Sequence, residues 1–145
     1  MSIQLKRAYD KPSVADGARV LVDRLWPRGV TKKRAAIDEW LKDLAPSDSL
    51  RKWAHANALA WNAFRKRYLK ELSEPAASKA LERLYDLARR RKTVTLVYSS
   101  RGLGGDPERT NAGVLKELLE GMRKPPTSSG PAKAAAVPMR AQRRK

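Results

Sequence analysis

Apolar residues recur along the chain in three stretches with the character of β-strands. Ile3 and Leu5 alternate with polar neighbours, and a turn-like segment rich in Asp, Pro and Gly leads from them to the apolar run 20–22. The segment 93–98, TVTLVY, is rich in β-branched residues and almost continuously apolar. The sequence therefore predicts three strands, of which the last resembles a central strand covered on both faces.

From Thr31 onwards the apolar positions are spaced three and four residues apart, which predicts amphipathic helices. Thr31 is the expected N-cap of the first helix, and Ser47 or Asp48 is that of the second. Pro75 stands where the first turn of a helix tolerates proline. The expected helices are 31–44, 47–72 with a break near Asn57, 75–88 with a cationic end, and 110–122.

This order of elements predicts a small single-domain α/β fold of residues 1–122, with a short sheet of parallel character covered by helices. If strands 20–22 and 93–98 are parallel neighbours, their carboxyl ends lie at the same edge of the sheet, which is where ligands bind in open α/β sheets. The sequence does not decide the strand order.

Charge divides the 145-residue chain into two regions. It contains 32 Lys or Arg and 15 Asp or Glu, which gives a formal net charge of +17. Residues 123–145 include seven of these cations, no acid and no aromatic residue, and are rich in Pro, Ser, Gly and Ala. Such a composition predicts a disordered basic tail that follows the folded domain.

Composition also excludes several classes of protein. Without cysteine there is no disulfide framework, thiol nucleophile or thiolate metal site. No apolar stretch approaches the roughly 20 residues of a membrane-spanning helix, and the amino terminus lacks a secretory signal. We expect a cytoplasmic protein that has no membrane contact, metal or cofactor.

The first segment that could carry chemistry is 22–29, VDRLWPRG, which follows the second strand. Asp23 is a candidate general acid or base. Arg24 and Arg28 offer paired donors that could hold a carboxylate or a phosphate. The structural alternative is an internal ion pair between Asp23 and an arginine that stabilises a turn, with Trp26 as a core anchor.

The second such segment is 99–106, SSRGLGGD, which lies between the last strand and the last helix. Its glycines let backbone N–H groups approach an anion, and the following helix adds free donors. The candidate anion-binding residues here are Ser99, Ser100, Arg101 and Asn111. The alternatives are a surface loop that merely tolerates glycine and a helix cap at Thr110 or Asn111.

Cationic clusters suggest a different function, nonspecific contact with nucleic acid. The alternative is a set of solvated faces that only aid solubility, because no helix-turn-helix or aromatic RNA-binding signature is present. The candidate contacts are Arg89, Arg90, Arg91, Lys92, Arg140, Arg143, Arg144 and Lys145. The single histidine, His55, lies between two alanines on a predicted helix and is expected to be exposed or partly packed rather than catalytic.

Several motifs resemble the YeaO-like bacterial family, a domain of unknown function numbered 488. The resemblance covers residues 1 to about 120 and leaves the tail outside. The matching segments are 6–10, 16–29, 40–47, 50–53, 64–68, 94–98 and 111–115. It implies a small cytoplasmic α/β protein and no settled activity.

This chain departs from the family at two places. Members usually carry a Trp-Phe-Gly-His-like segment where Trp53 is followed here by Ala54 and His55. After the last strand they usually carry a His-Asn pair, whereas here Thr110 precedes Asn111. If those histidines act in catalysis or metal binding in relatives, the resemblance implies that this chain lacks that capacity.

The leading hypothesis is an anion-accepting cleft at the sheet edge, with Asp23 as the acid or base of any chemistry. Two other functions remain: a nucleic-acid-associated accessory protein that uses basic helix faces and the tail, and a protein-interaction module without a ligand. The sequence decides neither turnover nor oligomeric state.

Overall fold

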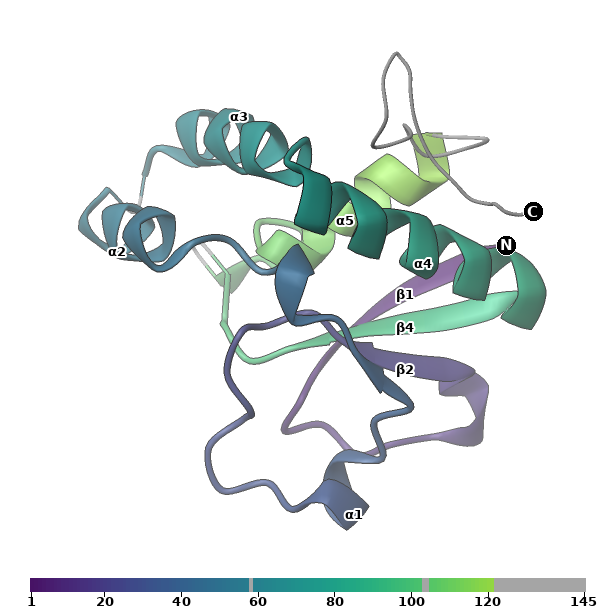
Figure 1. The fold of residues 1–145 in the computed structure, drawn as a ribbon. Helices are drawn as coiled ribbons and strands as arrows, with labels where there is room; N and C mark the ends of the chain where they lie inside the picture. The colour runs from purple at the N-terminus through teal and green to yellow at the C-terminus, as the bar shows by residue number, and fades with distance from the viewer. Residues whose placement is uncertain (58, 103–104, 122–145) are drawn as a thin grey trace.

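A computed structural model describes residues 1–57, 59–102 and 105–121. Four strands form one sheet in the order β1-β4-β2-β3, and every neighbouring pair is parallel. The strands are β1 (Ser2–Arg7), β2 (Ala18–Leu21), β3 (Glu39–Trp40) and β4 (Thr93–Tyr98) (Figure 1). The small single-domain α/β fold is confirmed.

The second and last strands are parallel neighbours, which is the arrangement that brings their carboxyl ends together. Val20 lies opposite Leu96 and Leu21 opposite Val97, so β2 and β4 run parallel as direct neighbours. On its other side β4 pairs with the whole of β1. The central position of β4 agrees with its almost continuously apolar sequence, since residues 94–98 are all buried.

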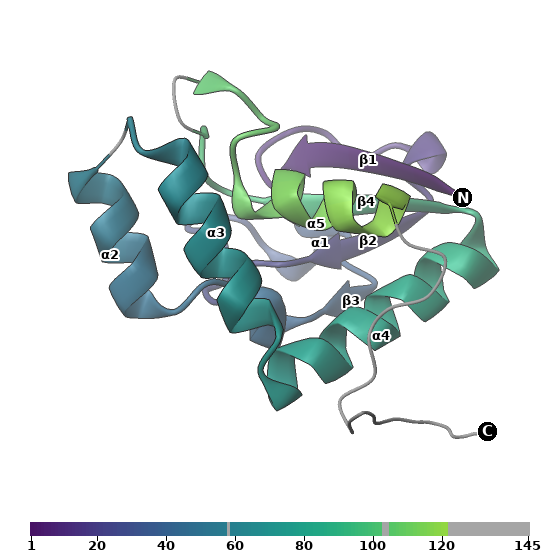
Figure 2. The same cartoon turned by 90° about the horizontal axis from the view of Figure 1, so that it is seen from above.

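Helices cover the two faces of the sheet unequally. The helices α3, α4 and α5 lie over one face, α2 packs beside α3, and the short α1 lies with the loops below the other face (Figures 1 and 2). The helices are α1 (Lys32–Ala35), α2 (Asp48–Ala56), α3 (Trp61–Leu72), α4 (Pro75–Arg91) and α5 (Asn111–Gly121). Two short 3₁₀ helices, η1 (Val14–Asp16) and η2 (Lys42–Leu44), complete the fold.

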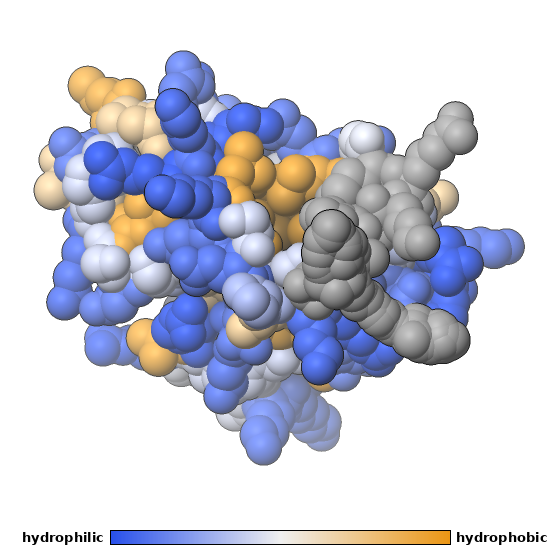
Figure 3. All heavy atoms as spheres, turned by 45° about the horizontal axis from the view of Figure 1, so that its top comes forward, coloured by the Kyte–Doolittle hydropathy of each residue, from blue (hydrophilic) through white to orange (hydrophobic). Residues whose placement is uncertain are grey.

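The main hydrophobic core lies between the sheet and the larger helical layer. It includes Val20 and Leu96 from the strands, Leu84 from α4 and Leu115 from α5, all fully buried. Tyr68 of α3 is buried there too, and its hydroxyl donates to the carbonyl oxygen of Leu44. The visible outer face of this layer carries mostly polar and charged side chains with small apolar areas between them (Figure 3).

The expected helix 31–44 is wrong beyond its first turn. The Thr31 side chain accepts from Arg34 N–H as a cap should, but α1 ends at Ala35 because Ala36 takes the left-handed conformation, with φ 50°. The following segment pairs with the free edge of β2 as β3, and the Asp38 carboxylate accepts the N–H of Arg19 at 2.8 Å. The hydrogen bonds that this segment makes with the free edge of β2 thus outweigh the preference for a helix that the spacing of its apolar residues indicates.

The other predicted helix boundaries agree with the structure. Ser47 caps α2 through the N–H of Leu50, and the expected break falls between Asn57 and Trp61. Pro75 occupies the first turn of α4, and the cationic residues lie at its end, at 89–92.

No helix among the residues the structure describes is both long and apolar enough to cross a membrane. The predicted tail at 123–145, with Arg140, Arg143, Arg144 and Lys145, lies outside the described residues.

A charged network is buried on the less covered face of the sheet. The Arg19 guanidinium donates to Asp16 at 2.7 Å and, through two nitrogens, to the carbonyl oxygen of Ala35. Lys6 also contacts Asp16, at 3.0 Å, and the Thr95 hydroxyl donates to the Asp16 carbonyl. Arg19 and Asp16 are 3% and 2% exposed. Their pairing fastens the turn before β2 and the end of α1 to the sheet.

Candidate functional site

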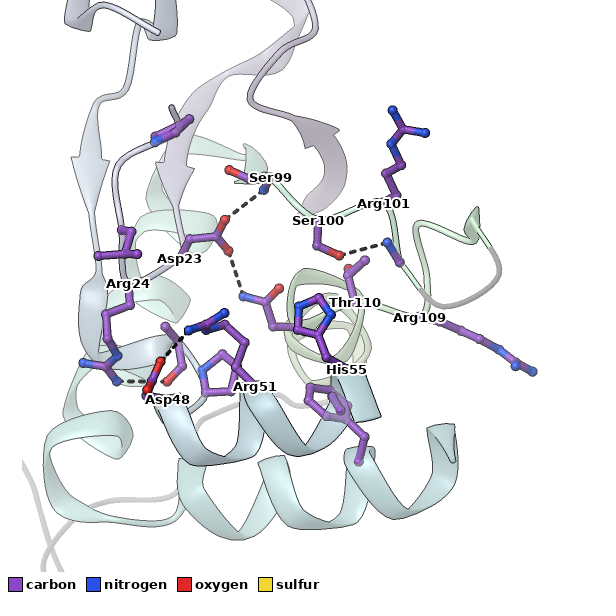
Figure 4. A pocket seen from close by; sticks show the side chains of 18 of the residues that line it. Asp23, Arg24, Asp48, Arg51, His55, Ser99, Ser100, Arg101, Arg109 and Thr110 are labelled. Carbon is purple, nitrogen blue, oxygen red and sulfur yellow. Dashed lines mark hydrogen bonds and ion pairs between the residues drawn. The ribbon is translucent and has the colours of Figure 1, made fainter. Parts of the chain in front are cut away.

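A cleft of about 780 Å³ opens at the carboxyl ends of β2 and β4 (Figure 4). Its walls come from the loop after β2, the loop after β4, helices α2 and α3, and the start of α5. All of the candidate acid/base and anion-binding residues line it: Asp23, Arg24, Arg28, Ser99, Ser100, Arg101 and Asn111. The parallel pairing of β2 with β4 explains why two segments 70 or more residues apart meet here.

Asp23 lies at the inner end of the cleft, directly after β2. Its Oδ2 accepts the N–H of Ser99 at 2.8 Å, and its Oδ1 accepts the side-chain amide of Asn111 at 3.2 Å. The same amide nitrogen also donates to the carbonyl oxygen of Val22, and the Trp40 indole donates to the carbonyl oxygen of Asp23. Ser99 and Asn111 therefore hold the carboxyl group in place, and Trp40 holds the backbone that carries it.

The environment of Asp23 favours its neutral form. Burial raises the pKa of the Asp23 carboxyl, and the hydrogen bonds from Asn111 and Ser99 lower it by less, so the pKa lies above its ordinary value of 3.8. None of the ion pairs among the described residues involves Asp23. The internal Asp23–Arg pair considered as a structural alternative is therefore absent from this part of the chain.

We expect Asp23→Asn to change how stability depends on pH. Between pH 3.8 and the raised pKa, the folded protein holds more protons at this site than the unfolded chain does. The free energy of unfolding of the wild type should therefore fall, relative to Asp23→Asn, as the pH rises from 4 to 7. Urea unfolding across this range measures the difference between the two proteins.

Asp48→Asn is the matched control, because hydrogen bonds from Arg51 and Lys52 hold the pKa of Asp48 below its ordinary value. For that exposed group the sign is opposite: the wild type gains relative to the variant as the pH rises through the lowered pKa towards 3.8, and the difference between the two is nearly constant from there to pH 7. A wild-type advantage over Asp23→Asn that stays constant or grows with pH would contradict the raised pKa.

The residues at the start of α5 have separate tasks. Thr110 is the helix cap, since its hydroxyl accepts the N–H of Gly113 at 3.0 Å. Asn111 is 8% exposed and directs its amide to Asp23 instead. Of the two alternatives for the cap, Thr110 is thus the residue that serves, and Asn111 belongs to the cleft.

The loop after β4 is ordered by contacts with β1 and with itself. Arg7 donates to the carbonyl oxygen of Ser99 at 2.7 Å, and the N–H of the same residue donates to Asp23. The Ser100 hydroxyl accepts the N–H of Gly102 at 2.9 Å. Gly102 has φ 81°, and a Cβ there would lie 2.1 Å from the carbonyl oxygen of Asp106. This glycine is therefore required by the turn and is not merely tolerated.

The arginines of the cleft differ in the hydrogen bonds and ion pairs that they make within the protein. Arg24 makes one long hydrogen bond to the carbonyl oxygen of Ala45, at 3.4 Å, and Arg51 pairs with Asp48. Arg28 is exposed and makes no hydrogen bond or ion pair with any residue the structure describes. Arg101 and Arg109 extend outward from the rim (Figure 4). Among the described residues, Arg28 and Arg101 are therefore the cleft arginines whose guanidinium groups are unengaged.

Sequence reasoning missed half of the cleft, the part that the helices supply. Arg51 and His55 come from α2, one helical turn apart, and Trp61 and Phe64 from α3. The Trp61 and Phe64 rings stack with centroids 5.6 Å apart, and Phe64 is 7% exposed. Arg109 was also missed. The helical spacing of apolar residues in 47–72 predicts a helix but gives Trp61 and Phe64 no place in a cleft, and no signal in one sequence indicates that α2 and α3 reach over the sheet edge.

His55 is exposed as expected, but it lies on the cleft rather than on an unrelated surface. No group of three or more potential metal-ligating side chains occurs within residues 1–57, 59–102 and 105–121. The nucleic-acid candidates Arg89, Arg90, Arg91 and Lys92 lie at the end of α4, just before β4 begins. They are therefore at the edge of the sheet opposite to the cleft.

Comparison with known proteins agrees with the resemblance in the motifs. The model of the family described as "Inactive DUF488-N3 subclade" matches residues 2–136, and so extends past residue 120, where the resemblance was expected to end. The chain is 45% identical over 101 residues to the uncharacterized protein YeaO of Escherichia coli, which covers 70% of this chain and 85% of the relative.

Mycobacterial relatives match over a longer part of the chain. The uncharacterized proteins Rv3073c of Mycobacterium tuberculosis and Mb3100c of Mycobacterium bovis are each 38% identical over 119 residues, 82% of this chain and 94% of the relative. No solved structure matches it. On the length of these matches, the chain belongs to the YeaO-like family of domain of unknown function 488.

Proposed function

We propose that this protein is a cytoplasmic binder of a small anion, which it holds in the cleft at the carboxyl ends of β2 and β4. The observation that carries the proposal is the charge of the residues that line the cavity, which include five arginines and two aspartates. One of those carboxylates, Asp48, is already paired with Arg51 and Lys52. An incoming anion thus meets an excess of guanidinium groups, which hold carboxylates and phosphates with paired donors.

The remaining carboxyl group, Asp23, makes no ion pair but accepts hydrogen bonds from Ser99 N–H and the Asn111 amide. Burial raises the pKa of its carboxyl above the ordinary value. Its position behind the arginines also suits a recognition role, because its oxygens can accept hydrogen bonds from a ligand's polar end. Asp23 remains the residue we would assign as acid or base if turnover occurs.

Binding without turnover is the form of the proposal that the comparisons favour. The matching family model is described as an inactive subclade. In this chain the hydrogen-bond partners of the Asp23 carboxylate are a backbone N–H and an amide. Neither group takes up or releases a proton in the way that a paired catalytic base does.

The test compares two arginine variants of the full-length protein by isothermal titration calorimetry with pyrophosphate. Arg28→Gln should weaken binding about tenfold or more, as expected when one charge-assisted hydrogen bond to an anion is lost. Arg91→Gln is the matched control. It removes the same charge from an exposed residue at the opposite end of the sheet, which also lacks a hydrogen-bond or ion-pair partner among the described residues.

Equal affinities of the two variants would contradict the cleft as the binding site, because a general effect of net charge acts on both alike. The nucleic-acid alternative predicts the reverse order. If Arg91→Gln weakens binding of a short oligonucleotide and Arg28→Gln does not, the basic end of α4 is the functional surface. Binding that falls steeply with salt would accompany that result.

A further inference from the structure

We infer that the anion carries a flat ring with N–H donors, so that the cleft accepts a nucleoside monophosphate with its base directed inward. The inference rests on the proposed function, since it names the class of ligand for the same cleft. Three features of the cleft carry it: its size, the presence of both exposed charged and buried aromatic side chains in its lining, and the chemistry at its inner end.

The cavity is too large for an inorganic anion alone. Its volume of about 780 Å³ falls within the range of ~300–1,000 Å³ that is usual for sites of organic ligands and cofactors. A phosphate group engages two or three donors and would leave most of this space to water. The remaining surface therefore needs a ligand with an extended second part.

The side chains that line the cleft range from exposed charged ones to buried aromatic ones. Arg28 and Arg101 are exposed, as is His55. Phe64, which also lines the cleft, is 7% exposed and stacks on the partly buried Trp61, with 26° between the ring planes. A lining that combines buried aromatic rings with exposed cationic groups suits a planar ring that bears its negative charge on the outward side.

The inner end of the cleft offers hydrogen-bond acceptors to that ring. Each oxygen of the Asp23 carboxyl accepts one internal hydrogen bond, from Ser99 N–H or from the Asn111 amide, and each has a further lone pair. Asn111 directs its side-chain nitrogen to Asp23 and Val22. A base with adjacent N–H and NH₂ groups, such as guanine, would satisfy both carboxyl oxygens at once.

The test is calorimetric binding to the full-length wild-type protein with three probes. Guanosine 5′-monophosphate has both ring and phosphate, ribose 5-phosphate lacks the ring, and guanosine lacks the phosphate. We expect the monophosphate to bind about five- to hundredfold more tightly than ribose 5-phosphate, the range found when a base stacks on an aromatic side chain.

Two variants locate the ring. Trp61→Leu keeps an apolar side chain but removes the flat surface, and Asp23→Asn alters the carboxyl group. Each should weaken binding of the nucleotide relative to that of ribose 5-phosphate, so that the preference for the nucleotide shrinks. Arg28→Gln should weaken both phosphates. The comparison of probes on the wild type stands even if Trp61→Leu fails to fold.

The outcomes separate the two levels of the proposal. Equal affinity for the nucleotide and ribose 5-phosphate overturns the ring inference and leaves the anion-binding function intact. Tight binding of guanosine alone, unaffected by Arg28→Gln, overturns the anion-binding function. If none of the three probes binds and pyrophosphate does not bind either, both the ring inference and the anion-binding function are overturned.

Discussion

Replacing Asp16 with alanine is expected to lower the free energy of unfolding at neutral pH by about 3–5 kcal/mol, the range found when one partner of a buried ion pair is removed. The Arg19 side chain is 4% exposed and would keep its positive charge inside the protein without a counter-charge. Its remaining hydrogen bonds go to the carbonyl oxygen of Ala35. Urea denaturation followed by circular dichroism measures the change.

The loss should shrink as the solution becomes acidic. Burial by itself raises the pKa of Asp16, but hydrogen bonds from Lys6, from Ser13 N–H and from Arg19 together outweigh it, so the pKa lies below its ordinary value of 3.8. The contribution of Asp16 is therefore complete above pH 3.8 and is lost as the pH falls through the lowered value.

Two further variants test whether the loss of stability depends on how deeply the ion pair is buried. Lys6 is 25% exposed in its contact with Asp16, so Lys6→Ala should cost less than Asp16→Ala. Asp86→Ala removes an exposed pair with Arg89 and should stay within about 1 kcal/mol of the wild type. A similar small loss for Asp16→Ala would mean that the network beneath the sheet is solvated and contributes no more than a surface pair.

Replacing Gly113 with alanine is expected to destabilise the protein by about 1–3 kcal/mol, as overpacking of a tight contact does. Helix propensity alone predicts the opposite sign, a gain of about 1 kcal/mol for alanine over glycine. The packing decides, because a Cβ at Gly113 would lie 2.1 Å from the carbonyl oxygen of Glu108. That atom belongs to the backbone and cannot turn aside like the end of a side chain.

Gly121→Ala in the same helix is the matched control, since no contacting atom of residues 1–57, 59–102 or 105–121 lies within 4 Å of the Cβ it would add. It should be neutral or slightly stabilising in the same denaturation experiment. Gly113→Ala should also weaken anion binding, because displacement of Glu108 moves the adjacent cleft residues Arg109 and Thr110. If both variants stabilise the protein, the backbone at Glu108 moves away from the added Cβ at little cost in free energy, and the prediction is wrong.

Asp16→Ala and Gly113→Ala change residues on opposite sides of the sheet, but both residues help to position the inner end of the cleft. Asp16 and Arg19 fix the entry to β2, whose other end delivers Asp23 to the cleft. Gly113 lets the loop from β4 pack closely on α5, which brings Asn111 to the same carboxyl group. Buried polar contacts and one close backbone approach therefore position the inner end of the cleft.

Much of the fold followed from local patterns. The period of the apolar residues identified β1, β2, β4 and the helices from α2 to α5, and Ser47 and Pro75 indicated where two of those helices begin. These signals are local, because capping and side-chain periodicity depend on residues within a few positions of each other. The prediction of a helix over 31–44 was wrong for the same reason. The free edge of β2, with which Asp38 and β3 form hydrogen bonds, is distant in sequence and leaves no local signal.

For the cleft, the sequence by itself determined which residues follow β2 and β4, and parallel pairing then required Asp23 and Ser99 to meet at one edge. Only the tertiary structure decided that Arg51, Trp61 and Phe64 close the other side, and that Asn111 rather than an arginine holds Asp23. Strand order constrains the ends of strands, whereas the direction in which α2 and α3 leave the sheet depends on packing between helices. Packing of that kind sums many weak contacts between residues far apart in the chain, and no local pattern records it.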